Sequence, residues 1–137
     1  MKPMSDKVFV DSNVFIYLLS DDERKKSIAC SILKTRPVIS TQVISENVNV
    51  LIRKFDNLSF EKVKHHVYIL NYFCFVADIT MLTIEKALAI KPKYGYQWYD
   101  STVLSAAVLQ DCNIIYSEDM QHGQIIENRL KIINPFL

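Results

Sequence analysis

The sequence predicts an α/β fold with a mostly parallel central sheet and helices on both faces. Short apolar runs recur along the chain and end at polar or acidic residues, as in Val8–Val10 and Asn113–Tyr116. Between these runs lie longer segments whose apolar residues repeat at the helical period. Half of the 137 residues are hydrophobic, which is enough for a sizeable core. Strands that alternate with helices are typical of parallel sheets covered on both sides.

The first half of the chain predicts two strands and three helices. Acids around Asp22 followed by bases suit a helix start, because the helix dipole favours that order. Pro37 ends this helix, and Thr41 is a candidate cap for the next one. The strands are expected at 8–10 and 38–40, and the helices at 13–19, from Asp22 to Pro37, and from Thr41 to Phe55.

The second half predicts three further helices and three further strands. Asp78 and Thr80 can cap the middle helix of this half, and Pro92 and Gly95 mark its end. A loop around Gly123 and a short turn precede the last strand. The helices are expected at 60–73, 81–90 and 100–110, and the strands at 74–77, 113–116 and 130–133.

Length and composition exclude several classes of protein. At 137 residues we expect one domain spanning 1–137. The chain has only two glycines, so it contains neither a GxGxxG dinucleotide loop nor a Walker A loop. A net charge of +1 means that any contact with nucleic acid must come from a local basic patch.

The three cysteines are scattered, odd in number and without CxxC pairs. This pattern argues against a disulfide scaffold or a zinc knuckle and favours a reducing cytoplasm. No apolar run approaches the length of a membrane span, and the segment from Met1 to Lys7 lacks the apolar core of a signal peptide. We therefore expect a cytoplasmic protein with no membrane contact.

Four acids lie near the ends of expected strands or helices: Asp11, Glu46, Asp100 and Asp119. Taken singly, Asp11 and Asp100 could be helix N-caps and Asp119 could belong to a polar turn. Glu46 shares its helix face with apolar residues, which predicts a buried carboxylate; the alternative is that it lies at an exposed edge of the helix. In an open α/β sheet, ligands bind outside the carboxyl ends of the strands, where Asp11 would stand.

Convergence of these acids would be costly without a counter-charge. Two like charges about 4 Å apart repel by roughly 4 kcal/mol at an effective dielectric near 20. No lysine or arginine is adjacent in sequence to any of the four acids. A hard cation with oxygen ligands, Mg²⁺ or Mn²⁺, would relieve the repulsion and could activate water for attack on a phosphodiester.

These motifs resemble those of the PIN-domain ribonucleases, and the similarity is closest to VapC-type toxins of bacterial toxin–antitoxin pairs. The resemblance rests on Asp11-Ser12-Asn13, Glu46 in a mid-chain helix, Asp100 opening an apolar helix, and the run 116–123 that contains Ser117-Glu118-Asp119. It covers nearly the whole chain, and it implies a PIN-like, Rossmann-like three-layer sandwich.

The resemblance also implies a function and a site. Asp11, Glu46, Asp100 and Asp119 match the acidic quartet that coordinates Mg²⁺ or Mn²⁺ for RNA cleavage. Asn13 and Ser117 match polar residues that hold those ligands in place, and Glu118 could share or replace the role of Asp119. The implied partners are an RNA substrate, an antitoxin that blocks the site, and a second copy of the chain in a homodimer.

Two other classes of function remain open from the residues alone. One is a metal-binding module similar to response-regulator receivers, which would need an acidic pair at the first strand end and a lysine after a late strand. Asp11 stands alone there, and no lysine follows the strand at 113–116 directly. The other is a nuclease-like domain that binds RNA without turnover. Elsewhere, His65 and His66 are expected to be solvated helix residues, and Trp98 to pack in the core or a dimer interface.

Overall fold

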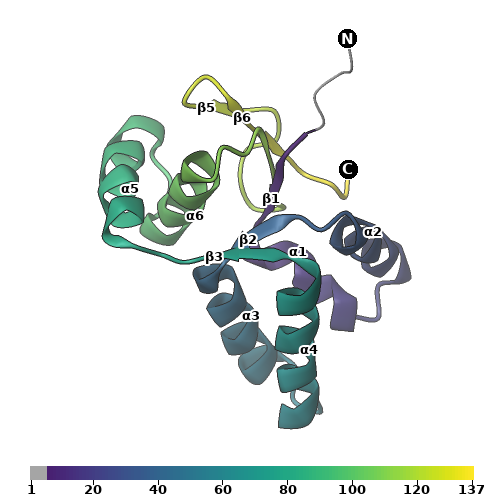
Figure 1. Ribbon diagram of the computed structural model, residues 1–137. Coiled ribbons are helices and arrows are strands. Elements are labelled where there is room, and N and C mark those ends of the chain that lie inside the picture. The colour runs from purple at the N-terminus through teal and green to yellow at the C-terminus, as the bar shows by residue number, and fades with distance from the viewer. Residues whose placement is uncertain (1–5) are drawn as a thin grey trace.

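A six-stranded sheet forms the centre of the computed structural model, which describes residues 6–137 (Figure 1). The order of its strands is β3-β2-β1-β4-β6-β5, and every neighbouring pair is parallel except β5 with β6. The strands are β1 (Val8–Val10), β2 (Val38–Ser40), β3 (Phe75–Ala77), β4 (Ile114–Tyr116), β5 (Ile125–Ile126) and β6 (Leu130–Ile133). Residues 1–5, part of the segment considered for a signal peptide, lie outside the described residues.

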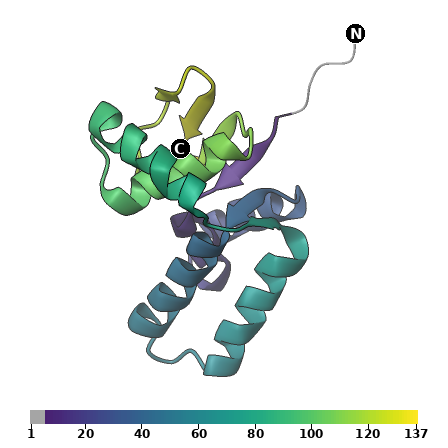
Figure 2. The same cartoon turned by 60° about the vertical axis from the view of Figure 1, so that its left-hand side comes forward.

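The helices form two groups on opposite faces of the sheet (Figures 1 and 2). The chain builds the sheet from β1 outward to β3 and then returns to the other side of β1 with β4. Because parallel crossovers are right-handed, this reversal places α5 and α6 on the face opposite the earlier helices. The helices are α1 (Ser12–Phe15), the 3₁₀ helix η1 (Ile16–Leu19), α2 (Glu23–Lys34), α3 (Thr41–Lys54), α4 (Phe60–Phe73), α5 (Met81–Tyr94) and α6 (Trp98–Leu109). The predicted α/β class with a mostly parallel sheet is confirmed.

The reversal in strand order creates a switch point between β1 and β4. At such a point the two flanking crossovers leave in opposite directions, so a crevice opens outside the carboxyl ends of the strands. Phe9 and Ile115, paired across β1 and β4, are fully buried and anchor the core beneath this crevice. The residues that follow β1 and β4 therefore lie side by side above the core.

Several element ends differ from the sequence-based expectation. Ser40 rather than Thr41 caps α3, because its side chain accepts the Val43 N–H. The expected helix at 13–19 is one α turn followed by a 3₁₀ turn. Pro92 lies within the last turn of α5, and the helix ends at Gly95 in the left-handed conformation with φ of 79°. Pro92 has no N–H for a bond to the carbonyl of Leu88, four residues earlier, yet α5 continues for two residues beyond it, to Tyr94.

The structure also contains an element that the sequence did not predict. β5 pairs antiparallel with β6, in the region expected to be a loop and turn. It has only two residues, Ile125 and Ile126, too few to show an alternation of apolar and polar residues. Across the described range of 6–137, no helix combines the length and the apolar character needed to span a membrane.

Candidate metal centre

Asp11 lies at the switch point, immediately after β1. Val10 pairs with Tyr116 across β1 and β4, and the Asp11 N–H donates to the Tyr116 carbonyl over 2.9 Å. This register brings Ser117 beside Asp11, and the Ser117 hydroxyl donates to Asp11 Oδ2 over 2.9 Å. Asp11 Oδ1 accepts the Ser12 N–H over 2.7 Å, so Asp11 also caps α1. The cap therefore uses one oxygen of the carboxylate, and the Ser117 hydroxyl bonds to the other.

Glu46 reaches the same place from α3. The Ser12 hydroxyl donates to Glu46 Oε2 over 2.9 Å and lies 3.4 Å from Asp11 Oδ1. A hydroxyl has only one proton to donate, so the Ser12 hydroxyl bonds mainly to Glu46, the nearer acceptor. The other Glu46 oxygen accepts the Gln42 amide over 2.5 Å. Glu46 is half-buried, which lies between the buried position that its apolar neighbours predicted and an exposed helix edge.

The other two acids are Asp100, on α6, and Asp119, in the loop after β4. Asp100 is half-buried in the first turn of α6, where Trp98 begins the helix two residues earlier than expected. It is therefore not the N-cap. Residues 101–107 of α6 are all buried, so this helix is firmly packed in the core and the position of Asp100 is fixed with it. Asp119 is exposed, and its N–H donates to Ser117 Oγ over 3.3 Å.

The charges of these acids influence one another. Burial raises the pKa of Asp11 to about 7, and the nearby charges of Asp100 and Glu46 add to the rise. The bonds from Ser117 and Ser12 oppose it. The pKa of Asp100 is also raised, first by burial and then by the charges of Asp119 and Glu46. Each of the four acids is thus close enough to at least one other for their charges to repel.

No positive side chain relieves this repulsion within residues 6–137, where none of the four acids forms an ion pair. The available donors are carboxylate and hydroxyl oxygens, which are the ligands that hard divalent cations prefer. The donor chemistry therefore fits such a cation. As placed, however, no three acidic, histidine or cysteine side chains of the described residues lie close enough together to hold a metal ion. Coordination by three or more of the acids would therefore require them to move closer together.

Asn13 and Glu118 connect the loop after β4 to the start of α1. Asn13 Nδ2 lies 3.5 Å from Asp11 Oδ2, and Asn13 Oδ1 accepts the Glu118 N–H over 3.1 Å. The Glu118 carboxylate is engaged elsewhere: it accepts the Tyr17 hydroxyl and pairs with Lys25, each over 2.5 Å. Glu118 is therefore neutralised by a base, whereas Asp119 is not.

Sequence reasoning overlooked several residues around the acids. Ser12 joins Asp11 to Glu46, and Gln42 joins Glu46 to α6 by accepting the Thr102 hydroxyl over 2.6 Å. Asn47 and His66 are buried and bonded to each other, so the expectation that His66 is solvated is wrong. A signal was present, because both polar residues lie at helical spacing among apolar ones.

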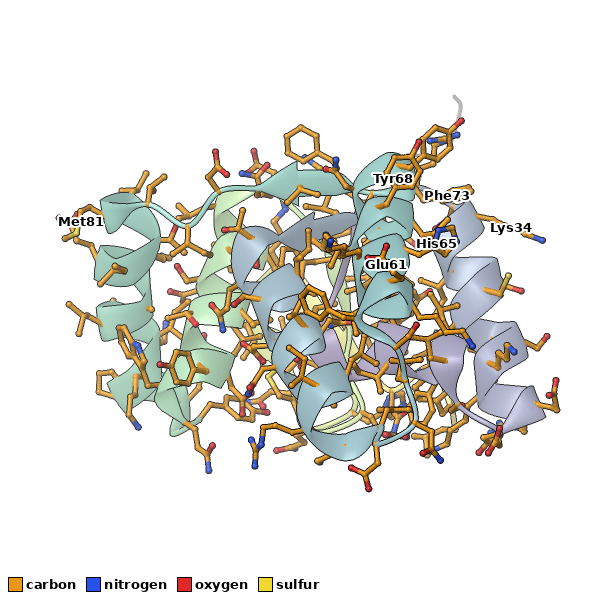
Figure 3. All side chains as sticks on the ribbon, turned by 90° about the horizontal axis from the view of Figure 1, so that it is seen from below. Lys34, Glu61, His65, Tyr68, Phe73 and Met81 are labelled. Carbon is orange, nitrogen blue, oxygen red and sulfur yellow. The ribbon has the colours of Figure 1, made fainter. Side chains whose placement is uncertain are left out.

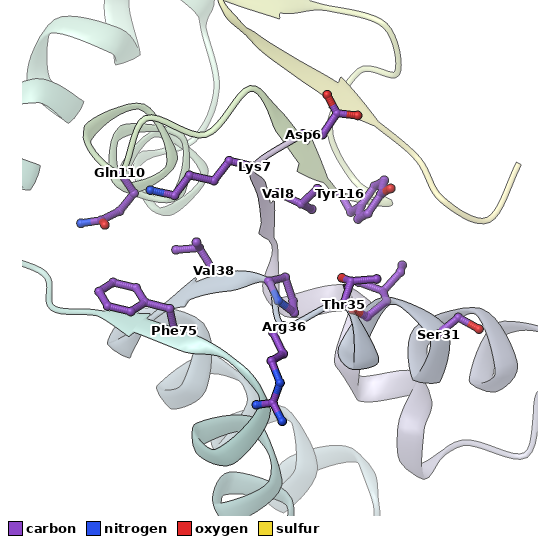
Figure 4. A pocket seen from close by; sticks show the side chains of 12 residues that line it. Asp6, Lys7, Val8, Ser31, Thr35, Arg36, Val38, Phe75, Gln110 and Tyr116 are labelled. Atoms are coloured by element: carbon purple, nitrogen blue, oxygen red, sulfur yellow. Dashed lines mark hydrogen bonds between the residues drawn. The ribbon is translucent and has the colours of Figure 1, made fainter. Parts of the chain in front are cut away.

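Two clefts differ in their relation to the acids. A cleft of about 930 Å³ reaches Glu46 and is lined in part by Trp98, Tyr99 and Asn49. Another, of about 840 Å³, lies around Lys7, Val38 and Phe75 at the amino ends of the strands (Figure 4). None of the four acids lines this second cleft. Of these two clefts, only the first is lined by one of the four acids, Glu46.

Comparison with solved structures shows the same fold in proteins of low sequence identity. A toxin–antitoxin complex from Klebsiella pneumoniae has a TM-score of 0.70 at 17% identity, covering 94% of this chain and 98% of that chain. FitAcB from Neisseria gonorrhoeae has a TM-score of 0.65 at 16% identity, covering 94% and 98%. VapC20 of Mycobacterium tuberculosis, described as a sarcin–ricin loop cleaving toxin, has 0.62 at 15%, covering 82% and 90%.

Sequence comparison identifies the family. No curated protein matches the chain. The family model of the PIN domain matches residues 8–126, which extend from β1 through β5 and include all four acids. Fold, strand order and family model agree, and the chain belongs to the PIN-domain family.

Proposed function

We propose that this chain is an endoribonuclease that depends on Mg²⁺ or Mn²⁺ and acts as the toxin of a type II toxin–antitoxin pair in the cytoplasm. One observation supports this most directly: Asp11, Glu46, Asp100 and Asp119 share one edge of the sheet without an ion-pairing base among the described residues. Membership of the PIN-domain family supports nuclease chemistry. VapC20, an RNA-cleaving toxin by its description, and the Klebsiella complex share the fold.

In this proposal each residue has a defined part. The four carboxylates would hold the cation, while Ser117 and Asn13 restrict the rotation of Asp11 through its Oδ2. Ser12 sets the spacing between Asp11 and Glu46. A bound divalent cation supplies Lewis acidity, which lowers the pKa of water and offsets charge on a phosphodiester. The cleft beside Glu46 would receive the RNA, with the exposed Tyr99 ring available for stacking on a base.

Cleavage of an RNA panel tests the proposal. The purified chain would be incubated with tRNA, rRNA and mRNA in Mg²⁺, in Mn²⁺ and in EDTA, beside the Asp11→Asn variant. We expect cleavage that needs metal and is lost in the variant. Glu61→Gln is a matched control, since Glu61 is exposed on α4 and its one ion pair among residues 6–137 is with Lys64. RNA binding without cleavage at any metal concentration would instead favour a nuclease-like binding domain.

The role of Glu118 can be tested in the same assay. Because Tyr17 and Lys25 already engage both of its carboxylate oxygens, we propose that Asp119 rather than Glu118 completes the acidic quartet. Asp119→Asn should then reduce cleavage far more than Glu118→Gln. The reverse order would exchange their roles.

We propose two protein partners, an antitoxin and a second copy of this chain. Most of the large exposed apolar side chains of the described residues lie on two pairs of elements. One set lies on α4 and β3 and the other on α5 and α6; Figure 3 marks Tyr68 on α4 and Met81 on α5. The members are Phe60, Tyr68, Tyr72 and Phe75 in the first set, and Met81, Leu82, Leu88 and Tyr99 in the second. Large exposed apolar patches mark interaction surfaces. The molar mass of the purified chain by light scattering tests the homodimer, and a monomer at micromolar concentration would contradict it.

A further inference from the structure

A chain of buried polar side chains links α4 to the acidic edge of the sheet. His66 on α4 is only 3% exposed, and Asn47 on α3 is fully buried. His66 Nε2 lies 2.9 Å from Asn47 Oδ1. Asn47 follows Glu46 directly, on the same helix. Neither side chain forms a hydrogen bond to any of the four acids. Burying these two polar side chains costs free energy, because both lose their hydration.

The orientation of the Asn47 amide follows from its partners. Its Nδ2 donates to the carbonyl oxygens of Ser12 and Val43, each over 3.0 Å. Carbonyl oxygens can only accept, so the amide nitrogen must face them and Oδ1 must face His66. Burial lowers the pKa of His66 to about 4, so the ring is neutral at pH 7. A neutral ring that donates to Oδ1 must carry its proton on Nε2.

Ser12 is the point where this chain meets the acids. The Asn47 amide donates to the Ser12 carbonyl. The Ser12 N–H donates to Asp11 Oδ1 over 2.7 Å, and the Ser12 hydroxyl donates to Glu46 Oε2 over 2.9 Å. One residue therefore connects two of the four carboxylates to the Asn47–His66 pair. If the Asn47 amide turned, the Ser12 carbonyl would lose this bond, and α1 and α3 would lose one of the contacts that set their spacing.

We propose that Asn47 and His66 are positioning residues for the metal centre: His66 fixes the Asn47 amide, which holds Ser12 and thereby the spacing of Asp11 and Glu46. The inference rests on the proposed metal-dependent function. It assigns the buried histidine a role that packing alone would not require, because a leucine could fill similar space without a polar partner. Groups that orient metal ligands typically contribute 10–100-fold to metal affinity or activity.

Three single variants and one measurement on the wild-type chain test the proposal. His66→Leu removes the donor, and His66→Gln keeps an N–H donor in a side chain of related length. His65→Leu is the matched control, because His65 is the exposed neighbour on the same helix (Figure 3). Mn²⁺ affinity by calorimetry, melting temperature without metal, and kcat and KM for RNA would be measured for each.

We expect His66→Leu to weaken Mn²⁺ binding by roughly 10-fold and to lower kcat at subsaturating metal, with KM for RNA little changed. His66→Gln should recover most of the affinity, and His65→Leu should match the wild type. ¹⁵N NMR of the wild type without metal should show the His66 proton on Nε2.

The contrary outcomes distinguish a failure of the positioning role from a failure of the proposed metal-dependent function. Wild-type Mn²⁺ affinity in a folded His66→Leu chain would overturn the positioning role alone, even if the melting temperature falls. A proton on Nδ1 instead of Nε2 would break the inferred chain of bonds whether or not the leucine variant folds. If the wild type itself binds no Mn²⁺, the proposed function fails first and the positioning role fails with it.

Discussion

Two acidic regions of this molecule have opposite electrostatics. At the switch point, Asp11 is buried beside other acids, and its pKa rises to about 7. At the turn between β5 and β6, Glu127 pairs with Lys93 over 2.8 Å and with Lys86 over 3.2 Å. The hydrogen bonds from Lys93 and then Lys86 lower the pKa of Glu127 to about 2. One acid lacks a cation within the described residues, and the other has two.

The charged form of Glu127 stabilises the fold, whereas the charged form of Asp11 destabilises it. Folding favours the charged form of Glu127 and disfavours the charged form of Asp11. Local conflicts of the second kind concentrate at functional sites, where stability is exchanged for chemistry. The direction of the pKa shift distinguishes the two regions: burial raises the pKa of Asp11, and hydrogen bonds from two lysines lower the pKa of Glu127.

The largest expected contrast is in catalysis. Asp100→Asn should reduce RNA cleavage by at least about 100-fold, because a ligand matters at least as much as the groups that orient it. Glu127→Gln should cleave at nearly the wild-type rate. Initial rates of both variants on one RNA at saturating metal provide the comparison. Equal losses in the two variants would remove the functional distinction between the regions.

For the stability of the metal-free chain we expect the opposite order: loss of the Asp11 charge should stabilise the fold, whereas loss of the Glu127 charge should destabilise it. The raised pKa of Asp11 means that its contribution to stability is fully present below pH 3.8 and is lost as the pH rises through about 7. Asp11→Asn should therefore stabilise the metal-free chain at pH 8, by up to about 4 kcal/mol. Asparagine can still accept the Ser12 N–H that caps α1.

Urea unfolding in EDTA at pH 8 and pH 5 measures this gain, which should shrink at the lower pH. Added Mg²⁺ should stabilise the wild type and leave Asp11→Asn unchanged. A destabilised Asp11→Asn chain at pH 8 would show that the buried charge is not a net cost.

His66 should make the fold sensitive to acid. Its pKa falls from 6.5 to about 4 because burial disfavours the charged ring. The unfolded chain therefore takes up a proton at higher pH than the folded chain does, and stability drops as the pH falls from about 6.5 to 4. The loss is on the order of 3 kcal/mol.

Because Asp11 acts in the opposite direction over part of this range, the useful quantity is the difference between the wild type and His66→Gln. Unfolding free energies at half-unit pH intervals should show the wild type declining more steeply below pH 6.5. Parallel curves would mean that the ring is solvated.

The smallest expected effect belongs to Glu127. Its lowered pKa contributes stability above pH 4.5 that is lost as the pH falls through about 2. The pair lies at the surface, so Glu127→Gln should cost only about 1 kcal/mol at pH 7. Urea midpoints in low and high salt measure the cost, which should fall in high salt because the ions screen the lysines. A salt-independent cost would indicate packing rather than charge.

The sequence alone determined much of the framework. The ranges of α4 and β6 matched their apolar patterns, and the fold class followed from alternating strands and helices. These features depend on neighbours in sequence, whose spacing is visible in one dimension. Short elements were less accessible: two residues of β5 carry no period, and Ser40 rather than Thr41 caps α3 through a side-chain bond that neighbouring residue types cannot distinguish.

Only the tertiary structure decided how the acids differ. Strand ends pointed to Asp11 and Asp119, but nothing in the run Ser117-Glu118-Asp119 indicates that Lys25, 93 positions before Glu118, neutralises Glu118. Likewise, Ser12 joins Asp11 to Glu46, and His66 reaches Asn47, across helices that are distant in sequence. Charge pairing and burial depend on distances in three dimensions, and these arise only when the sheet order brings β1 beside β4 and α3 against α4.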